Sequence, residues 1–415
     1  MLKRITVDQL RPGMHVARFD GGWLDHPFWR QSRRINGAHD IETIAAAGVR
    51  AVWIDLTRGC DAESAAPVPA ASSTPSSAAP PAAPASIACA RQPIEAELDR
   101  AAHICRRARD AVVTMFGEAR MGKAIDSLAA AALVEEISES VERNRGALVN
   151  LARLKTTDDY TYMHSVAVCG LMIALARELG MDTDGARRAG LAGLLHDLGK
   201  AQIPLSILNK PGRLTAGELA QIRQHPLLGH RLLAESSAVN EVALDVCLHH
   251  HERIDGAGYP DGLDDECISL HAKMGAVCDV YDAITSNRPY KAGWDPAESI
   301  GRMAEWANGG QFDQRVLHAF VKSIGIYPTG SLVRLQSGRL AMVIDQNPDT
   351  LTRPRVKAFF SIAAGVQIRP ETIDLSRANE PDAIVGREDP ERWKFRNLDE
   401  IWAGRHALDA SLHAR

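Results

Sequence analysis

The residues best suited to chemistry lie in one stretch, where His249, His250 and His251 are followed by an acid and a glycine-rich loop. The residues before them, 239–247, have the apolar spacing of an amphipathic helix. Continuing that helix places His250 and His251 on its apolar face and His249 on its polar face. Two core histidines bonded to backbone carbonyls would be one explanation. The other is a ligand pair, which requires that the chain supply further ligands.

Four other predicted helices also carry His or Asp on their buried sides. The apolar stripe of one helix includes His164, and that of the next leads to His196 and Asp197. A short helix is predicted to run as far as His225, and a stripe of small residues includes Asp279. Five predicted helices of one segment therefore bring imidazole or carboxylate groups into the interior.

Buried imidazoles and carboxylates need hydrogen-bond partners, paired charges or a metal ion. Imidazole and carboxylate ligands without thiolate favour iron or manganese, with zinc as an alternative. We expect two divalent ions bridged by Asp197, about 3.5–4 Å apart as in two-metal hydrolytic sites, with a bridging hydroxide as nucleophile. The predicted ligands are His164, His196, Asp197, His225, His250, His251 and Asp279.

A basic segment follows Asp279 and contains Arg288 and Lys291. Arginine can hold a phosphate through two hydrogen bonds, and lysine adds a point charge. Taken alone, the segment would be a solvated basic turn. Beside a two-metal site, these two residues are predicted to bind substrate phosphate.

Composition limits the classes of protein that remain. No apolar run is long enough to span a membrane, and the first residues lack the apolar region of a signal peptide, so a cytoplasmic location is expected. The net charge of −4 gives no broad electrostatic case for binding nucleic acid or anionic membranes. The seven cysteines include no CxxC pair, which indicates reduced thiols rather than a disulfide framework or a zinc ribbon.

Four separated motifs occur in an order that resembles the HD-GYP subfamily of HD-domain phosphohydrolases. They are HDLGK (196–200), KPGRLT (210–215), HHERIDGAGYPDGL (250–263) and TSNRPYK (285–291). Residues 1–60 more weakly resemble the small N-terminal domain that often precedes such domains. The resemblance implies an HD-type helical bundle, a centre of two or three metals, and hydrolysis of cyclic di-GMP to pGpG, with GMP as a further product.

The expected fold is mainly α, with a small N-terminal α/β or β-rich domain and a small C-terminal β-barrel-like segment. The predicted domains are an N-terminal accessory or regulatory domain (1–60), an Ala/Pro/Ser-rich disordered linker (61–90), a helical entry subdomain (91–157), an HD-GYP catalytic domain (158–327), a small β segment (328–375) and a charged tail (376–415).

The resemblance also implies a role for each motif residue. One metal would be held by His164, His196, Asp197 and Asp279. The other would be held by Asp197, His225, His250 and His251. Lys200 would lie beside the bridging water or the scissile phosphate, and Arg288 and Lys291 would contact the nucleotide. Tyr259 belongs to the signature loop, which shapes the site and can dock partners.

The chain departs from some relatives at Tyr160, one helical turn before His164. Those relatives carry Glu there, and that Glu supports a third metal. Tyr160 therefore favours two metals, and pGpG as the main early product. His230 and His249 match no ligand position.

Two alternatives to a cyclic di-GMP phosphodiesterase remain at this point. One is an HD phosphohydrolase that acts on another nucleotide, and the other is a catalytically silent scaffold that signals through the Gly-Tyr-Pro loop. The complete ligand set argues against the scaffold. Expected protein partners are diguanylate cyclases or other signalling proteins, and a second copy of the chain.

Overall fold

The computed structural model describes residues 2–19, 33–35, 37, 41, 44, 51–55, 57, 91–154, 160–236, 239–286, 293–395 and 398–407. The chain divides into two compact units, Met1–Ala88 and Cys89–Arg415, which are treated separately below. The predicted linker, 61–90, lies outside the described residues, and the predicted domain boundaries stay predictions.

The first unit contains a four-stranded antiparallel sheet with the strand order β1-β4-β2-β3. The strands are β1 (Leu2–Thr6), β2 (His15–Phe19), β3 (Arg33–Arg34) and β4 (Ala51–Asp55), and a 3-10 turn η1 (Val7–Gln9) follows β1. Ile5 of β1 pairs with Val52 of β4, and both are buried together with Ile54, as expected for a sheet with one covered face. The core consists of Ile5, Val7, Leu10, Met14, Val16, Ile35, Ile44, Val52 and Ile54.

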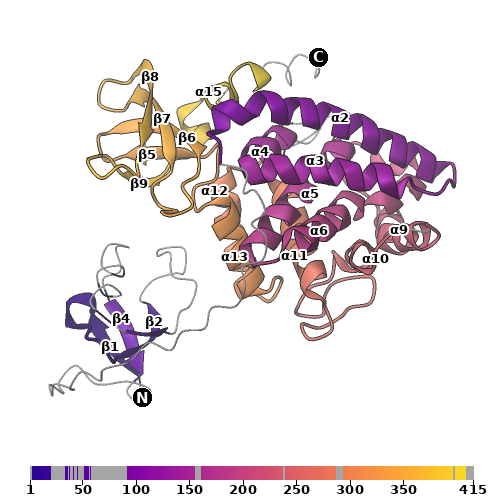
Figure 1. The fold of residues 1–415 in the computed structure, drawn as a ribbon, viewed down its shortest axis with the longest axis horizontal. Helices are drawn as coiled ribbons and strands as arrows, with labels where there is room; N and C mark the ends of the chain where they lie inside the picture. The colour runs from indigo at the N-terminus through magenta and orange to yellow at the C-terminus, as the bar shows by residue number, and fades with distance from the viewer. Residues whose placement is uncertain are drawn as a thin grey trace, which may run out of the picture. The chain divides into compact units, whose positions relative to one another are not determined.

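The second unit is mainly helical, as predicted, and α5 (Tyr160–Glu178) lies at its centre. Every residue from Met163 to Ala176 is buried, because helices α2, α3, α4, α6, α11 and α13 contact α5. Figure 1 shows two of these helices, α2 and α3, side by side along one side of the bundle. The surrounding helices are α2 (Ile94–Arg120), α3 (Ser127–Arg143), α4 (Ala147–Arg153), α6 (Thr183–Leu195), α11 (Leu270–Thr285), α12 (Pro296–Asn308) and α13 (Gln314–Ile324).

Helix α6 lies very close to α5 because it presents glycines to it. A Cβ atom on Gly193 would lie 2.9 Å from the carbonyl oxygen of Val168, and one on Gly190 would lie 2.6 Å from Cγ1 of Ile173. Larger residues would push the helices apart. This contact brings the C-terminal end of α6 beside the inner side of α5.

The remaining elements of the bundle follow α6 and precede α11. They are η3 (Leu198–Gln202), α7 (Leu205–Leu208), α8 (Ala216–Ile222), α9 (His225–Ala234) and α10 (Glu241–His249). Gly199 of η3 packs against α9 so closely that a Cβ atom there would lie 1.9 Å from the carbonyl oxygen of His225. Only glycine allows this approach, which places the start of α9 against the end of α6.

The helix predicted to run as far as His225 ends earlier. Helix α8 begins with a capping box formed by Thr215 and Glu218 and ends at Ile222. His225 instead begins α9, with Pro226 in the first turn, where the missing N–H of proline costs no helical hydrogen bond.

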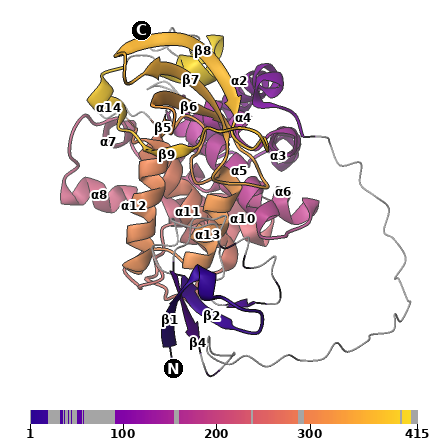
Figure 2. The same ribbon diagram turned by 90° about the vertical axis from the view of Figure 1, so that its left-hand side faces the viewer.

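A five-stranded antiparallel sheet follows the bundle, with the strand order β8-β7-β6-β5-β9 (Figure 2). The strands are β5 (Leu332–Leu335), β6 (Arg339–Asp345), β7 (Arg355–Ser361), β8 (Val366–Asp374) and β9 (Ile384–Arg387), followed by α14 (Pro390–Trp393) and α15 (Asp399–Ala403). Strands β5 and β6 pair as an antiparallel hairpin within the predicted β segment. Because β8 and β9 lie at opposite edges, the predicted barrel-like closure is not confirmed. Strand β9 comes from the segment that was predicted to be a charged tail.

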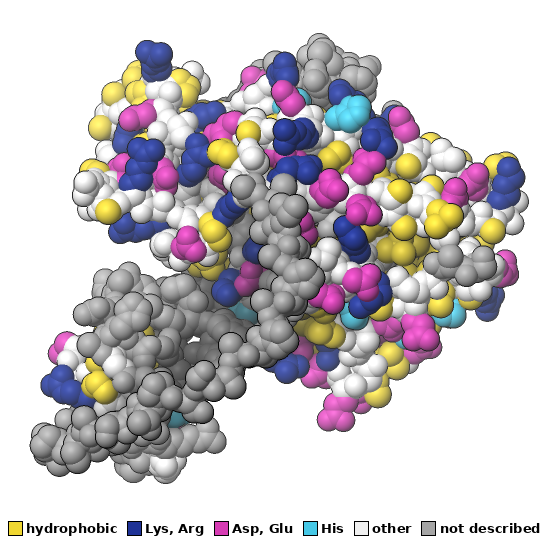
Figure 3. All heavy atoms as spheres, viewed as in Figure 1, with side chains coloured by type: hydrophobic (Ala, Val, Ile, Leu, Met, Phe, Trp, Pro, Cys, Tyr) yellow, Lys and Arg dark blue, Asp and Glu magenta, His cyan; other side chains and the backbone are white. Residues whose placement is uncertain are grey.

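The surface carries charges of both signs. Figure 3 shows one face of the molecule, on which Lys and Arg side chains are interspersed with Asp and Glu side chains. Within the described ranges, no helix is both long enough and apolar enough to cross a membrane. Because charges of both signs are interspersed on this face, attraction of a phosphate ligand would depend on a local group of cations.

Candidate metal centre

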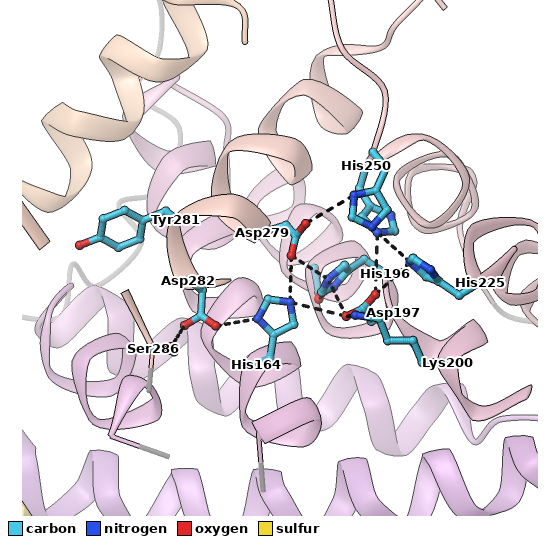
Figure 4. A network of polar contacts seen from close by, with 12 residues as sticks. His164, His196, Asp197, Lys200, His225, His250, Asp279, Tyr281, Asp282 and Ser286 are labelled. Carbon is cyan, nitrogen blue, oxygen red and sulfur yellow. Dashed lines mark hydrogen bonds and ion pairs between the residues drawn. The ribbon is translucent and has the colours of Figure 1, made fainter. Parts of the chain in front are cut away.

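Seven inward-facing side chains from α5, α6, α9, α10 and α11, or from residues directly after these helices, gather in the bundle. Six of them are labelled in Figure 4. Their ligand atoms form three overlapping groups, and within each group these atoms lie within 4.8 Å of one another. The groups are His164, His196 and Asp279; His196, Asp197 and His250; and His225, His250 and His251. All seven predicted ligands are thus brought together.

Asp197 lies at the middle of this cluster and is 1% exposed. Its Oδ2 lies 3.5 Å from Nε2 of His164 and 3.4 Å from Nε2 of His196. Its Oδ1 lies 3.2 Å from Nε2 of His225 and 3.8 Å from Nε2 of His250. The two carboxylate oxygens therefore face two different sets of imidazoles, which is the geometry that a bridging ligand requires.

Asp279 closes the cluster from α11. Its Oδ1 lies 3.0 Å from Nε2 of His164 and 3.9 Å from Nε2 of His196. Its Oδ2 lies 3.7 Å from Nδ1 of His251. Asp279 therefore also faces a residue that the family resemblance assigns to the other metal.

Three of the imidazoles are oriented by the backbone of their own helical turn. The Nδ1 atoms of His196, His225 and His250 lie 2.7–3.0 Å from the carbonyl oxygens of Gly193, Ile222 and Val246. A carbonyl can only accept a hydrogen bond, so each Nδ1 carries the proton. Each Nε2 then directs a lone pair into the cluster, as a metal ligand must.

His164 is oriented by a carboxylate instead. Its Nδ1 lies 2.6 Å from Oδ2 of Asp282, which is 2% exposed, and Oδ1 of Asp282 accepts a hydrogen bond from Oγ of Ser286. Burial opposes protonation, but Asp279 and Asp282 together raise the pKa of His164. Asp282 lies one turn after Asp279 on the same face of α11, but no pattern in the sequence indicated its role.

Burial favours the neutral form of three other imidazoles, His196, His250 and His251. Burial lowers the pKa of His250 well below its ordinary value, and it lowers that of His251 to about 3. Burial also lowers the pKa of His196. Neutral imidazole is the form that binds metal.

The two carboxylates are ionised although they are buried. Burial alone would raise the pKa of Asp197, but Lys200, His196 and His225 together hold it well below the ordinary value. His164 and His251 do the same for Asp279 against the effect of burial. The cluster therefore combines ionised carboxylates with three imidazoles whose pKa values are lowered and with His164, whose pKa is raised.

The donor set fits divalent metal ions. Among the described residues, the buried Nε2 of His196 has no hydrogen-bond partner, although buried polar atoms are normally paired. Five imidazoles and two carboxylates, without thiolate, are the ligands that divalent transition metals accept. A metal ion would satisfy the lone pairs that otherwise face one another across the cluster.

Lys200 lies at the edge of the cluster on η3. Its Nζ is 2.5 Å from Oδ2 of Asp197, and its side chain is 23% exposed. It is therefore a cation that reaches both the central carboxylate and the solvent. Arg288 and Lys291, the predicted phosphate ligands, lie outside the described residues.

The glycine-rich loop is organised by Glu252, which is 3% exposed. Its carboxylate accepts hydrogen bonds from the backbone N–H groups of Asp261, Gly262 and Leu263 at 2.8–3.1 Å. Gly258 packs on it so closely that a Cβ atom would lie 2.6 Å from Oε2 of Glu252. The sequence shows Glu252 directly after the three histidines but does not indicate this role.

The loop places Tyr259 against the cluster. The ring of Tyr259 stacks on that of His251, with the ring centroids 4.7 Å apart. Cζ of Arg223 lies 5.1 Å from the centroid of the Tyr259 ring. His249 lies apart from the cluster, with Nδ1 2.8 Å from Oδ1 of Asp245.

The fold and the site define a mainly helical protein with a buried His/Asp centre for divalent metals, and comparisons with known proteins agree. Residues 137–316 match the HD domain family, and residues 2–130 match a domain of unknown function, DUF3391. The chain is 55% identical over 405 residues to the cyclic di-GMP phosphodiesterase PA4108 of Pseudomonas aeruginosa. The aligned residues cover 97% of this chain and 96% of that relative. The chain belongs to the HD-GYP family of HD-domain phosphodiesterases.

Two further relatives match less than half of the chain. The cyclic di-GMP phosphodiesterase response regulator RpfG of Xanthomonas campestris is 38% identical over 193 residues, which cover 46% of this chain and 50% of that relative. The 3′3′-cGAMP-specific phosphodiesterase 1 of Vibrio cholerae is 34% identical over 164 residues, which cover 40% of this chain and 38% of that relative.

Proposed function

We propose that this protein is a metal-dependent phosphodiesterase that hydrolyses cyclic di-GMP to linear pGpG. The observation that carries the proposal is the position of Asp197, whose two carboxylate oxygens face separate sets of imidazoles. The relative that is 55% identical over nearly the whole chain, and is named a cyclic di-GMP phosphodiesterase, supports the choice of substrate.

Two divalent ions, iron or manganese, would occupy the centre. His164, His196, Asp197 and Asp279 would hold one ion, and Asp197, His225, His250 and His251 the other. When bound, such ions generate hydroxide from water at neutral pH and polarise phosphoryl oxygens. The described side chains supply no other group that is positioned as a nucleophile in the cluster.

The remaining site residues bind and orient the substrate. Hydrolysis adds water across one phosphodiester, so that the P–O3′ bond breaks, the 3′ oxygen gains a proton and the 5′ phosphate stays on pGpG. Lys200 would stabilise the charge that develops on the phosphoryl oxygens, because its ammonium group lies beside Asp197. Arg288 and Lys291 would bind phosphate, and Tyr259 would shape the wall beside His251.

Tyr160 bears on how far the reaction proceeds. Its ring lies parallel to that of His164, with the centroids 6.0 Å apart, and it offers no carboxylate for a third ion. A second hydrolysis would require the site to rebind a product with an added terminal phosphate. We therefore expect pGpG to accumulate before GMP forms.

Metal analysis of anaerobically purified protein, coupled to a time course of products from cyclic di-GMP, tests the proposal. We expect two ions per chain and early accumulation of pGpG. Three ions per chain, or GMP without prior pGpG, would contradict the argument from Tyr160. A fully metal-loaded chain that leaves cyclic di-GMP intact would instead favour another nucleotide, for which 3′3′-cGAMP is the first to try.

A further inference from the structure

An exposed arginine is held beside the metal centre by an aromatic ring. Arg223 is the residue after α8, and its Cζ lies 5.1 Å from the centroid of Tyr259, whose ring in turn stacks on His251. The backbone at Arg223 is also fixed, since Nδ1 of His225 is bonded to the carbonyl of Ile222. The position of the guanidinium is therefore linked to two candidate metal ligands.

Arg223 has no charged partner among the described residues. In the part of the chain that the structure describes, Arg223 forms no ion pair, and its N–H groups donate to no side chain or carbonyl. A solvated arginine that rests on a tyrosine is common and needs no function. An arginine without an ion pair beside a proposed substrate site has N–H donors that remain available to a bound ligand.

The chemistry of the guanidinium selects one part of the substrate. Its place over the Tyr259 ring keeps the guanidinium beside the site and leaves the N–H groups on its planar edge free to donate. Guanine presents two adjacent acceptors, O6 and N7, that match this edge, whereas adenine presents a donor where guanine has O6. The phosphodiesters can be bound by the metal ions and by Lys200, Arg288 and Lys291.

We propose that Arg223 binds the O6/N7 edge of a guanine base of the substrate, and so makes the site selective for guanine over adenine. This inference rests on the proposed function, because it takes a cyclic dinucleotide as the substrate. Tyr259 then has two roles, since it contacts His251 and also holds the guanine-reading side chain in place.

The test measures base selectivity rather than activity. Cyclic di-GMP and cyclic di-AMP are compared as competitive inhibitors of the hydrolysis of bis(p-nitrophenyl) phosphate, a substrate without a base, by the metal-loaded full chain. In Arg223→Lys, which keeps the charge but loses the paired donors, the preference for cyclic di-GMP should fall about tenfold. Arg231→Lys, a change at an exposed arginine of α9, is the matched control and should keep the preference.

Three results would overturn the inference. If both inhibitors weaken equally in Arg223→Lys, the contact is with phosphate and not with guanine. If neither weakens, Arg223 is a solvated surface residue. If Arg231→Lys loses the preference as well, the effect is not specific to the position of Arg223. Failure of the wild-type chain to hydrolyse bis(p-nitrophenyl) phosphate would count against the proposed function, and calorimetric binding of the same two ligands would still decide the role of Arg223.

Discussion

The two sides of the metal centre are built differently. The carboxylate half, defined as His164, His196 and Asp279, is buried throughout and lies on α5, after α6 and on α11. The histidine half, defined as His225, His250 and His251, contains no carboxylate of its own, and the side chain of His251 is 24% exposed. One half is deep and contains an ionised carboxylate, and the other contains imidazoles alone and reaches the surface.

This difference predicts that the two halves differ in metal affinity and in access to the substrate. Negative ligands bind a divalent cation more strongly, so an ion in the carboxylate half should be held tightly and exchange slowly. An ion in the histidine half, which has no carboxylate of its own, should bind more weakly. The substrate should approach from the histidine half, where His251, Tyr259 and Arg223 form a layer that leads to solvent.

The largest effect on metal content and turnover is expected from removal of the ligand that the two halves share. Asp197→Ala should lose both ions, because each would lose a ligand and their mutual repulsion would be unscreened. Loss of two-metal catalysis should reduce turnover about 10³-fold or more. Metal content and turnover are measured together, with circular dichroism to show that the helices persist. Two ions per chain in this variant would rule out a bridge at Asp197.

A narrower change should affect one half alone. Asp282→Asn keeps the shape at Nδ1 of His164 but removes the buried negative charge beside it. Loss of such an outer ligand partner reduces metal affinity about 10–100-fold. Titration with metal should therefore show one weakened site and one unchanged site. The control is Asp349→Asn, which removes an exposed carboxylate from a residue that follows β6. Equal weakening of both metal sites in Asp282→Asn would contradict the separation of the halves.

The glycine-rich loop beside the histidine half can be destabilised without a change in any candidate metal ligand. Glu252→Gln places an amide N–H₂ group against backbone N–H donors, so at least one of the three loop hydrogen bonds is lost. The free energy of unfolding should fall by about 1–3 kcal/mol, the usual cost of a buried unsatisfied group. Chemical denaturation measures the loss, and limited proteolysis should cut the loop sooner. An unchanged cleavage pattern would mean that Glu252 does not hold the loop.

The smallest effect is expected at the histidine outside both halves. His249 pairs with Asp245 and Asp261 on the polar face of α10, and a partly exposed pair of this kind is worth less than about 1 kcal/mol. His249→Ala should therefore keep activity within about fivefold, whereas His250→Ala should abolish it. Comparable losses in both variants would show that the triple-histidine stretch acts as a unit.

Helical periodicity predicted six of the seven candidate ligands on the apolar side of a helix or directly after it, whereas His225 was assigned to the end of one helix and begins the next. It could not identify Asp282, because the contact with His164 depends on which faces of α5 and α11 meet. It also could not identify the role of Glu252, whose partners are backbone N–H groups of an irregular loop. Arg223 lay in a stretch without a distinguishing pattern, and its contact with Tyr259 joins segments that are separate in the chain.

Limits of the same kind explain the differences in the fold. The end of α8 at Ile222 follows from the start of α9 at His225, which residue spacing alone does not separate. Strand β9 was missed because it is short and its residues alternate between partly exposed and exposed. Its pairing with β5 is a tertiary contact, and such contacts decide the state of short segments against local preference.

The hydrogen bonds from Nδ1 of His196, His225 and His250 to their own helical turns have a consequence for cofactor loading. The rings are already in the tautomer and direction that a ligand needs, so the ordering entropy is lost during folding rather than at metal capture. The apoprotein is in effect a template for its ions. Stripping the metal with a chelator should leave the bundle folded, and adding it back should restore turnover at the rate of ion entry, without a refolding delay.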